Sequence, residues 1–257
     1  MSAGAVLEVK GLTKRFGGLT AVAGLDFEVR KGEILGLIGP NGAGKSTTFN
    51  LIAGALPATS GEVSFEGQGL LGLAPHQIAA RGVLRTFQHN RPFAGMPVLE
   101  NVLVGAHTRF NASLWSVVLG NAGAEEAQRR DKARELVDFV GLGDYLHADV
   151  GTLSFGQGRL LEIARALAGE PKLMLFDEPA AGLTPAELDR LQEIMRGIAA
   201  RGIAVLLIEH DMHFLLPLAQ RVVVLNFGAK IADGLPDEIR ANRAVMDAYL
   251  GQHAAAR

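Results

Sequence analysis

Residues 39–47 contain a complete phosphate-binding loop, Gly-Pro-Asn-Gly-Ala-Gly-Lys-Ser-Thr, which follows the pattern GxxxxGK(S/T). The residues before it, 33–38, form a short apolar segment, and residues 45–53 contain no helix breaker. These patterns predict a buried strand before the loop and a helix after it, which is the context that the motif requires. A glycine-rich turn without a ligand is the alternative, and the Lys-Ser pair at the start of the helix disfavours it. The loop therefore predicts a site for a nucleoside triphosphate.

Every residue of the loop is a candidate nucleotide contact. Glycine allows the backbone to place successive N–H groups on one side, and the start of the following helix adds positive potential there. The Lys45 ammonium can reach the β- and γ-phosphates, and the Ser46 hydroxyl can ligate Mg²⁺. The predicted contacts are Gly39, Pro40, Asn41, Gly42, Ala43, Gly44, Lys45, Ser46 and Thr47.

Composition limits the class of protein. At 257 residues with 48% hydrophobic residues, the chain can form one large domain or a core with a subdomain. A formal net charge of −2 argues against a surface that coats nucleic acid, and the absence of cysteine excludes disulfides. No signal-peptide pattern or apolar run of about 18 residues is present, so we expect a soluble intracellular protein without direct membrane insertion.

Strand and helix patterns alternate along most of the chain. Residues 6–10, 25–30 and 61–65 read as strands of a small antiparallel sheet beside the phosphate-loop core. Residues 96–143 turn helical, and the clearest amphipathic piece is 125–140, with Ala133, Leu136, Val137 and Val140 on one face. Further strands are predicted at residues 173–176, 205–208 and 221–225. The chain therefore predicts a parallel α/β sheet that a helical segment interrupts.

Two acids follow the predicted strand at residues 173–176. In α/β sheets, the carboxyl ends of buried parallel strands are the places where ligands bind. Asp177 can hold Mg²⁺ directly or through water, and Glu178 can accept a proton from, or orient, the water that attacks the γ-phosphate. Acids at a strand end can also be solvated turn residues. Together with the phosphate loop, they predict a catalytic edge.

A second candidate anion site precedes the helical run at residues 159–168. Ser154 stands where a helix N-cap belongs, and capping alone is sufficient to explain it. The alternative is that Ser154, the Gly156 N–H and the helix N-terminus together bind an anion. Since the phosphate loop already holds a triphosphate, a second anion site makes most sense if it reaches a nucleotide held by another chain.

These motifs, in this order, resemble the ATP-binding subunits of ABC transporters over nearly the whole chain. They are the phosphate loop, Leu-Ser-Phe-Gly-Gln, the Leu-Met-Leu-Phe-Asp-Glu strand and Ile-Glu-His at 208–210. The resemblance implies a P-loop NTPase (RecA-like) core with an antiparallel β subdomain and an inserted α-helical subdomain. We expect residues 1–95 to form the β subdomain and the phosphate-loop part of the core. Residues 96–165 would form the helical subdomain with the signature motif, and residues 166–257 the rest of the core and the C-terminal helices.

The resemblance also implies roles for individual residues. ATP and Mg²⁺ would lie in a head-to-tail dimer, between the phosphate loop of one subunit and Ser154, Gly156 and Gln157 of the other. Glu178 would be the catalytic carboxylate, and His210 would contact the γ-phosphate and order Glu178. Gln88 would contact Mg²⁺ and the attacking water, and Phe16 would stack on adenine. Without the other motifs, the preferred interpretation of His210 is an ordinary polar residue at a strand end, and that of Phe16 is an ordinary core aromatic.

Two positions depart from the usual family pattern. Phe155 replaces a glycine of the signature, so its backbone should avoid positive φ while its N–H remains available. Thr184 stands where many members carry the D-loop aspartate. Thr184, Pro185 and Glu187 together form a favourable helix start, so a structural role is sufficient for Thr184. Any D-loop role of this residue stays open.

A narrower resemblance is to the ATPases of branched-chain amino-acid importers. It rests on Glu-Pro-Ala-Ala-Gly-Leu-Thr-Pro from residue 178, Ile-Glu-His-Asp-Met from 208, Ala-Tyr-Leu-Gly from 248, Phe155 and the insertion at 108–125. The implied partners are a second ABC ATPase subunit (the same chain or a paralogue), two transmembrane permease subunits and a periplasmic substrate-binding protein. The implied place is the cytoplasmic side of the cell membrane, bound to the permeases, with no nucleic-acid partner.

Several alternatives stay open from the sequence. Importers of urea or amides and exporters of lipopolysaccharide use similar ATPases, and ABC ATPases without a transport role also exist. A degenerate regulatory subunit is disfavoured by the intact Lys45, Asp177, Glu178 and His210. The apolar part of the 108–125 insertion can be subdomain core or a surface that docks a permease. The transported molecule is not encoded in this chain.

Overall fold

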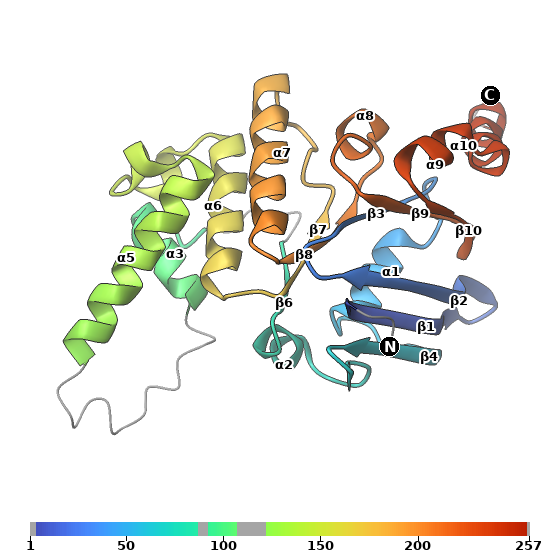
Figure 1. Cartoon of the computed structure of the whole chain (residues 1–257), viewed down its shortest axis with the longest axis horizontal. Helices are drawn as coiled ribbons and strands as arrows, with labels where there is room; N and C mark the ends of the chain where they lie inside the picture. Colours follow the sequence, from blue (N-terminus) through green and yellow to red (C-terminus); the bar gives the residue numbers. More distant parts are fainter. Residues whose placement is uncertain (1–3, 87–91, 107–121, 256–257) are drawn as a thin grey trace.

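A six-stranded sheet forms the centre of the structure, a computed structural model that describes residues 4–86, 92–106 and 122–255 (Figure 1). Its strands are Ile34–Ile38 (β3), Val83–Arg85 (β6), Leu173–Asp177 (β7), Ala204–Ile208 (β8), Arg221–Asn226 (β9) and Ala229–Gly234 (β10). They are ordered β10-β9-β3-β8-β7-β6, and all neighbours are parallel except β10 and β9. Every residue of β3, β7 and β8 is buried, as in sheets covered on both faces. The predicted parallel core is confirmed.

A smaller antiparallel sheet lies beside this core. Its strands are Ala5–Phe16 (β1), Leu19–Arg30 (β2), Ser60–Phe65 (β4) and Gln68–Gly69 (β5), in the order β2-β1-β4-β5. The first two strands are longer than predicted. Gly11 and Gly24, with φ of 55° and 59°, lie at register shifts inside the β1–β2 pair and not in turns between strands. Glycine therefore marks bulges here, and the strands continue past them.

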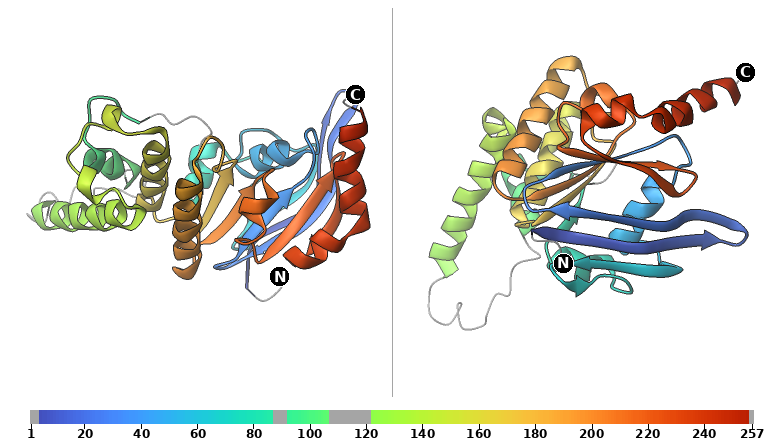
Figure 2. Two further views of the ribbon diagram at one scale, coloured as in Figure 1. Left: turned by 90° about the horizontal axis from the view of Figure 1, so that it is seen from above. Right: turned by 45° about the vertical axis from the view of Figure 1, so that its right-hand side comes forward.

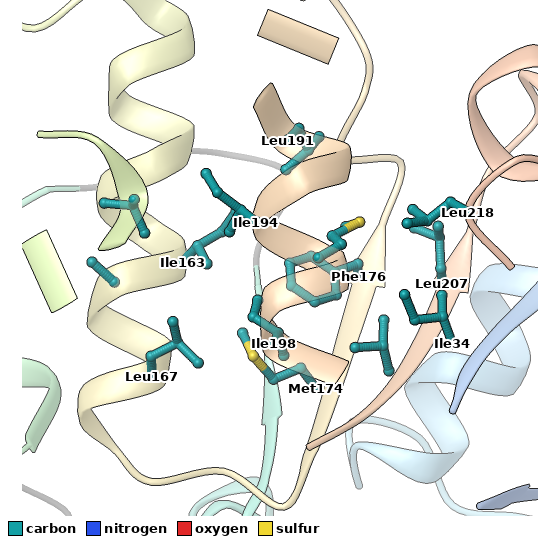
Figure 3. Close-up of a cluster of buried hydrophobic side chains, with 14 of the residues drawn as sticks. Ile34, Ile163, Leu167, Met174, Phe176, Leu191, Ile194, Ile198, Leu207 and Leu218 are labelled. Atoms are coloured by element: carbon teal, nitrogen blue, oxygen red, sulfur yellow. The ribbon is translucent and has the colours of Figure 1, made fainter. Parts of the chain in front are cut away.

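The two faces of the central sheet pack against different partners, because side chains alternate along each strand. On one face, Ile34, Phe176 and Leu207 belong to one buried cluster with side chains of the helices Phe155–Ala168 (α6) and Pro185–Ala200 (α7). Within this cluster, α7 lies between the sheet and α6 (Figure 3). On the other face, the intervening residues, such as Leu35 and Leu175, pack with the antiparallel sheet and with the helix Lys45–Ile52 (α1). This packing on both faces holds the central strands in register, so that their carboxyl ends lie at one edge.

Three helices form a separate group beyond α7, away from the antiparallel sheet (Figures 1 and 2). They are Val98–Gly105 (α3), Ala122–Val140 (α5) and α6, which pack on one another. The predicted apolar face of α5 is confirmed, since Ala133, Leu136, Val137 and Val140 are all buried. Because α6 continues to residue 168, it extends past the expected boundary at 165; the domain limits stay a prediction.

Short helices complete the described chain. They are Pro75–Ala80 (α2), Met212–Leu215 (α8), Pro236–Ala241 (α9) and Arg243–Ala255 (α10), with 3₁₀ turns at Gly143–Tyr145 (η2) and Val150–Thr152 (η3). The C-terminal helix α10 packs against α9 and β10. Within the described residues, no helix combines the length and apolarity needed to cross a bilayer. Most of the 108–125 insertion, with its apolar stretch, lies outside the described residues.

Candidate functional site

The strand register brings three sequence motifs to one edge of the central sheet. In the parallel ladders, Leu37 of β3 lies beside Ile208 of β8, and Ile208 lies beside Asp177 of β7. The phosphate loop follows directly after β3, the Glu209–His210 pair follows β8, and the Asp177–Glu178 pair begins at the last residue of β7. Residues more than a hundred positions apart in sequence therefore lie next to one another at the carboxyl ends of the strands, where α/β folds bind ligands.

The phosphate loop is held tightly from behind by two other strands. Gly39 and Gly44 have positive φ of 151° and 101°. A Cβ atom at Gly39 would overlap the carbonyl oxygen of Leu225, and one at Gly44 would overlap that of Ala21. Only glycine fits at both positions. The loop ends at Gly44, which is the N-cap of α1, so the helix N-terminus points toward the loop as an anion site requires.

Lys45 is turned back over this loop. Its side chain is buried, with the residue 6% exposed, and Nζ donates hydrogen bonds to the carbonyl oxygens of Gly39 at 2.6 Å and Pro40 at 3.0 Å. Burial lowers the pKa of the Lys45 ammonium, while the nearby Glu178 and Asp177 carboxylates oppose that decrease. The ammonium thus lies between the loop and the two acids, and phosphate oxygens can take the place of the two carbonyls as its acceptors.

Asp177 has one carboxylate oxygen paired and one without a partner. Oδ2 accepts a hydrogen bond from the Arg85 guanidinium at 2.6 Å, and Arg85 also donates to Asn50 Oδ1 at 2.6 Å. Oδ1 is buried and has no hydrogen-bond partner among the described residues. A buried carboxylate oxygen of this kind needs a donor or a cation. Asp177 therefore fits a Mg²⁺ ligand, as predicted, whereas the Arg85 ion pair was not predicted.

Besides Asp177, two further residues, Ser46 and Gln88, are predicted to ligate Mg²⁺. Ser46 lies exposed in the first turn of α1, and Gln88 lies outside the described residues. Within the described parts of the chain, no group of three or more His, Cys, Asp or Glu residues could hold a metal ion alone. Magnesium is commonly held by one or two protein ligands together with substrate phosphates. The residues present fit that arrangement.

Glu178 adopts a strained backbone conformation next to His210. Its φ is 49°, which is uncommon for a residue with a side chain. The Glu178 N–H donates to the Ile208 carbonyl oxygen at 3.0 Å, which ties the end of β7 to the end of β8. Glu178 Oε1 lies 3.8 Å from His210 Nδ1, and the His210 side chain is 59% exposed. The predicted acid and imidazole are therefore brought together where water can reach them.

Residues 154–157, which we call the Ser154 turn, cap the N-terminus of α6. Ser154 Oγ accepts from the Gln157 N–H at 3.2 Å, and Gln157 Oε1 accepts from the Ser154 N–H at 2.8 Å. The capping interpretation of Ser154 is confirmed, and Gln157 shares this role. Gly156 is buried, and a Cβ there would overlap the Glu187 carboxylate of α7. As expected, Phe155 has no positive φ.

The Ser154 turn and the phosphate loop belong to different parts of the molecule. In both Figure 1 and Figure 2, α7 lies between α6 and α1. The two predicted anion sites are therefore not joined into one site within this chain. Thr184, at the start of α7, accepts from the Glu187 N–H and donates to its carboxylate at 2.8 Å, which confirms the predicted helix start.

Phe16 stands at the end of β1, and the residue is 46% exposed. The interpretation as an ordinary core aromatic is therefore wrong. The Lys14 ammonium lies 4.8 Å from the ring centroid, a cation–π distance. An exposed aromatic on a hairpin next to the phosphate-loop core can stack on a nucleotide base.

Comparison with known proteins now decides the family. The sequence model of the family described as "ABC transporter" matches residues 22–181, and that of "Branched-chain amino acid ATP-binding cassette transporter" matches residues 229–255. The first match spans the phosphate loop, the Ser154 turn and the two acids. The chain belongs to the ABC transporter family of ATP-binding cassettes.

Relatives resemble this cassette over nearly their whole length. The high-affinity branched-chain amino acid transport ATP-binding protein BraF of Pseudomonas aeruginosa is 41% identical over 250 residues, covering 96% of this chain and 98% of BraF. LivG of Escherichia coli has the same identity and coverage. A crystal structure of an ABC transporter cassette in its ADP conformation is 33% identical, with a TM-score of 0.84, covering 96% and 99% of the two chains. The cassette is an ABC ATPase with a P-loop NTPase fold.

Three residues around the site of the cassette were not given a role from the sequence. Arg85 pairs with Asp177, Glu209 is buried beside His210, and the buried Tyr249 hydroxyl of α10 lies near the backbone of Gly39 without a hydrogen-bond partner among the described residues. Glu209 and Tyr249 stood in stretches that carried the family resemblance, and Arg85 stood three residues before Gln88. The contacts of Arg85 with Asp177 and of Tyr249 with Gly39 join segments distant in sequence, and the burial of Glu209 depends on the packing around it, so spacing within a motif reveals none of them.

Proposed function

We propose that this cassette hydrolyses MgATP to drive the import of branched-chain or related amino acids. The proposed substrate class rests on the match of residues 229–255 to the branched-chain amino acid family model, and the names of BraF and LivG support it. The juxtaposition of the phosphate loop with Asp177 and Glu178 supports the hydrolysis. ATP is the nucleotide, and Mg²⁺ is the metal ion.

In this proposal, the residues at the carboxyl ends of the central strands have separate roles in binding and hydrolysis. The loop Gly39–Thr47 surrounds the phosphates, and Lys45 exchanges its carbonyl partners for β- and γ-phosphate oxygens. Ser46 and Asp177 ligate Mg²⁺, together with Gln88. Glu178 orients the attacking water and accepts its proton, and His210 holds the γ-phosphate and orders Glu178. Phe16 stacks on adenine.

The second half of each site comes from a facing cassette. Ser154, Gly156 and Gln157 would approach the γ-phosphate that the partner's loop holds, with the N-terminus of α6 pointing toward it. The position of α7 between α6 and α1 supports this, because one chain does not join its own two anion sites (Figures 1 and 2). The partner is a second copy or a paralogous ATPase.

The remaining partners follow from the transport role. Two transmembrane permease subunits would hold the two cassettes at the cytoplasmic face of the cell membrane, and a periplasmic binding protein would deliver the substrate. ATP-driven closing of the cassette pair and its reopening after hydrolysis would drive the permeases between their two orientations.

Reconstitution in proteoliposomes tests this proposal. The cassette is purified with its permeases, ATP is enclosed on the cassette side, and uptake of labelled leucine, isoleucine and valine is measured with the binding protein present. We expect uptake that requires ATP and is lost with Glu178→Gln. Uptake of urea or an amide without uptake of any branched-chain amino acid would contradict the substrate class. Recovery of the cassette without permeases, on ribosomes, would contradict the transport role.

A further inference from the structure

The strained backbone at Glu178 raises the question of what holds it. A left-handed conformation at a residue with a Cβ is energetically unfavourable, and it persists only where the surroundings fix it. On its N-terminal side, the Glu178 N–H is bound by the Ile208 carbonyl oxygen at 3.0 Å. On its C-terminal side, residue 179 is proline and has no N–H. The next backbone N–H, that of Ala180, donates to Glu209 Oε1 at 2.9 Å. Ile208 at the end of β8 and Glu209 directly after it therefore hold the backbone on both sides of the bend at Glu178 by hydrogen bonds.

Glu209 is an unusual residue for this place. It is 1% exposed, directly after a fully buried strand. Burial raises the pKa of the Glu209 carboxyl, and the Ala180 and His210 N–H groups oppose that increase. The titratable groups that face it are His210, whose Nδ1 lies 3.9 Å from Oε2, and Glu178. Burying a carboxyl is costly, so its hydrogen bonds must provide compensation that a nonpolar residue would not need.

Both carboxylate oxygens of Glu209 accept hydrogen bonds from backbone N–H groups near Glu178 and His210. Oε1 binds the Ala180 N–H, two residues after Glu178, and Oε2 accepts from the His210 N–H at 3.3 Å. The Ala180 carbonyl oxygen in turn accepts from the Leu183 N–H at 3.2 Å. The Glu209 side chain thus links the bend at Glu178 to the backbone of His210. Through Ala180 it also links the bend to the segment that leads to Thr184.

We infer that Glu209 is a positioning residue for ATP hydrolysis: its hydrogen bond to the Ala180 N–H fixes the bend that aims the Glu178 carboxylate at the attacking water. The inference rests on the proposed role of Glu178 as the catalytic carboxylate. Glu209 touches neither nucleotide nor water in this scheme, and its removal acts on turnover and not on ATP binding.

Steady-state ATPase assays and ATP-binding titrations on the purified chain test this. Glu209→Ala removes the acceptor and should lower kcat about 10- to 100-fold, the cost of a small misplacement of a catalytic group. The ATP dissociation constant and KM should stay within about twofold, because the phosphate loop is untouched. Glu209→Gln keeps an amide oxygen for the Ala180 N–H and should restore most of the turnover.

A buried carboxylate elsewhere provides the matched control. Glu33 has a side chain 9% exposed, accepts from the Arg30 N–H and the Arg221 guanidinium, and precedes β3 at the end opposite the phosphate loop. Glu33→Ala should lower the thermal unfolding midpoint without lowering kcat. If Glu209→Ala is insoluble, Glu209→Asp replaces it, because its shorter side chain keeps the charge and does not reach the Ala180 N–H.

Combination with Glu178→Gln separates this inference from the proposed function. If Glu209 acts through Glu178, Glu209→Ala should not lower the residual rate of the Glu178→Gln variant further. Wild-type turnover in Glu209→Ala or Glu209→Asp, or no recovery in Glu209→Gln, overturns the inference while leaving Glu178 in place. Wild-type turnover in Glu178→Gln itself would overturn the proposed role of Glu178.

Discussion

At the scale of single residues, the proposed nucleotide binding depends most directly on Lys45. Its ammonium is already out of water, and its hydrogen bonds go to the Gly39 and Pro40 carbonyl oxygens of the loop it serves. A phosphate therefore meets a cation that is desolvated and aimed before binding. Such preorganisation strengthens a charged hydrogen bond relative to one formed by a solvated, mobile side chain.

Lys45→Ala should weaken ATP binding about 10- to 100-fold, which corresponds to the loss of a charged hydrogen bond worth about 1.5–3 kcal/mol. Isothermal titration with a slowly hydrolysed ATP analogue measures this. Lys132→Ala is the control, since Lys132 is exposed and pairs with Glu170 on the surface. Equal affinity of the Lys45→Ala variant and the wild type would contradict the assigned role.

Tyr249 gives a pH-dependent prediction. Burial raises the pKa of its hydroxyl from an ordinary 10.0 to about 12, and the nearby Gly39 backbone partly opposes the increase. Below pH 10 neither the folded nor the unfolded state ionises. Between 10 and about 12 only the unfolded state loses the proton, so the stability of the fold falls as pH rises. Tyr249→Phe should show a shallower decrease in unfolding free energy over that window, measured by urea unfolding. A slope equal to the wild type would count against the burial of this ring.

At the scale of elements, α6 and α7 begin with the same device. Ser154 with Gln157, and Thr184 with Glu187, form reciprocal capping boxes. Each satisfies two backbone N–H groups that a helix start otherwise leaves without partners. Hydrogen bonds from the Thr184 N–H and hydroxyl also lower the pKa of the Glu187 carboxyl. In the proposed dimer, the Ser154 turn would combine helix capping with contact to the partner, whereas capping alone is sufficient to explain Thr184.

Thr184→Ala should lower the free energy of unfolding by about 1 kcal/mol, because it removes the cap of α7. Thr184→Ser keeps the hydroxyl and should be close to the wild type. Urea unfolding followed by circular dichroism measures both. Equal stability of the alanine and wild-type proteins would show that the capping box contributes nothing.

The sequence predicts elements well where one segment alone determines them. The strand before the phosphate loop, the Asp177–Glu178 strand and the apolar face of α5 are apolar patterns with clear ends. The three-residue strand β6 and the half-buried strand β10 were missed, because neither has enough buried residues to give a pattern. The strained φ of Glu178 and the Arg85–Asp177 pair were missed because they depend on contacts across the sheet.

At the scale of the whole molecule, α7 lies between α6 and α1, the helices that begin at the two predicted anion sites (Figures 1 and 2). If the proposed dimer is correct, Ser154→Asp should leave ATP binding by the chain's own loop unchanged. Aspartate is also a good N-cap, so α6 should keep its start. The added charge would repel the facing γ-phosphate and prevent ATP-dependent dimerisation. Gel filtration with ATP in the Glu178→Gln background measures this, with Ser154→Thr as the control. A dimer of unchanged stability in the Ser154→Asp variant would contradict the shared site.

The most direct test of the central claim is the fate of ATP in the Glu178→Gln variant. The purified variant is incubated with MgATP, separated by gel filtration, and the nucleotide in each fraction is identified. We predict that the chain elutes as a dimer that contains uncleaved ATP, while the wild type releases ADP and elutes without trapped nucleotide. Release of ADP by Glu178→Gln at the wild-type rate would contradict the assignment of Glu178 and the mechanism built on it.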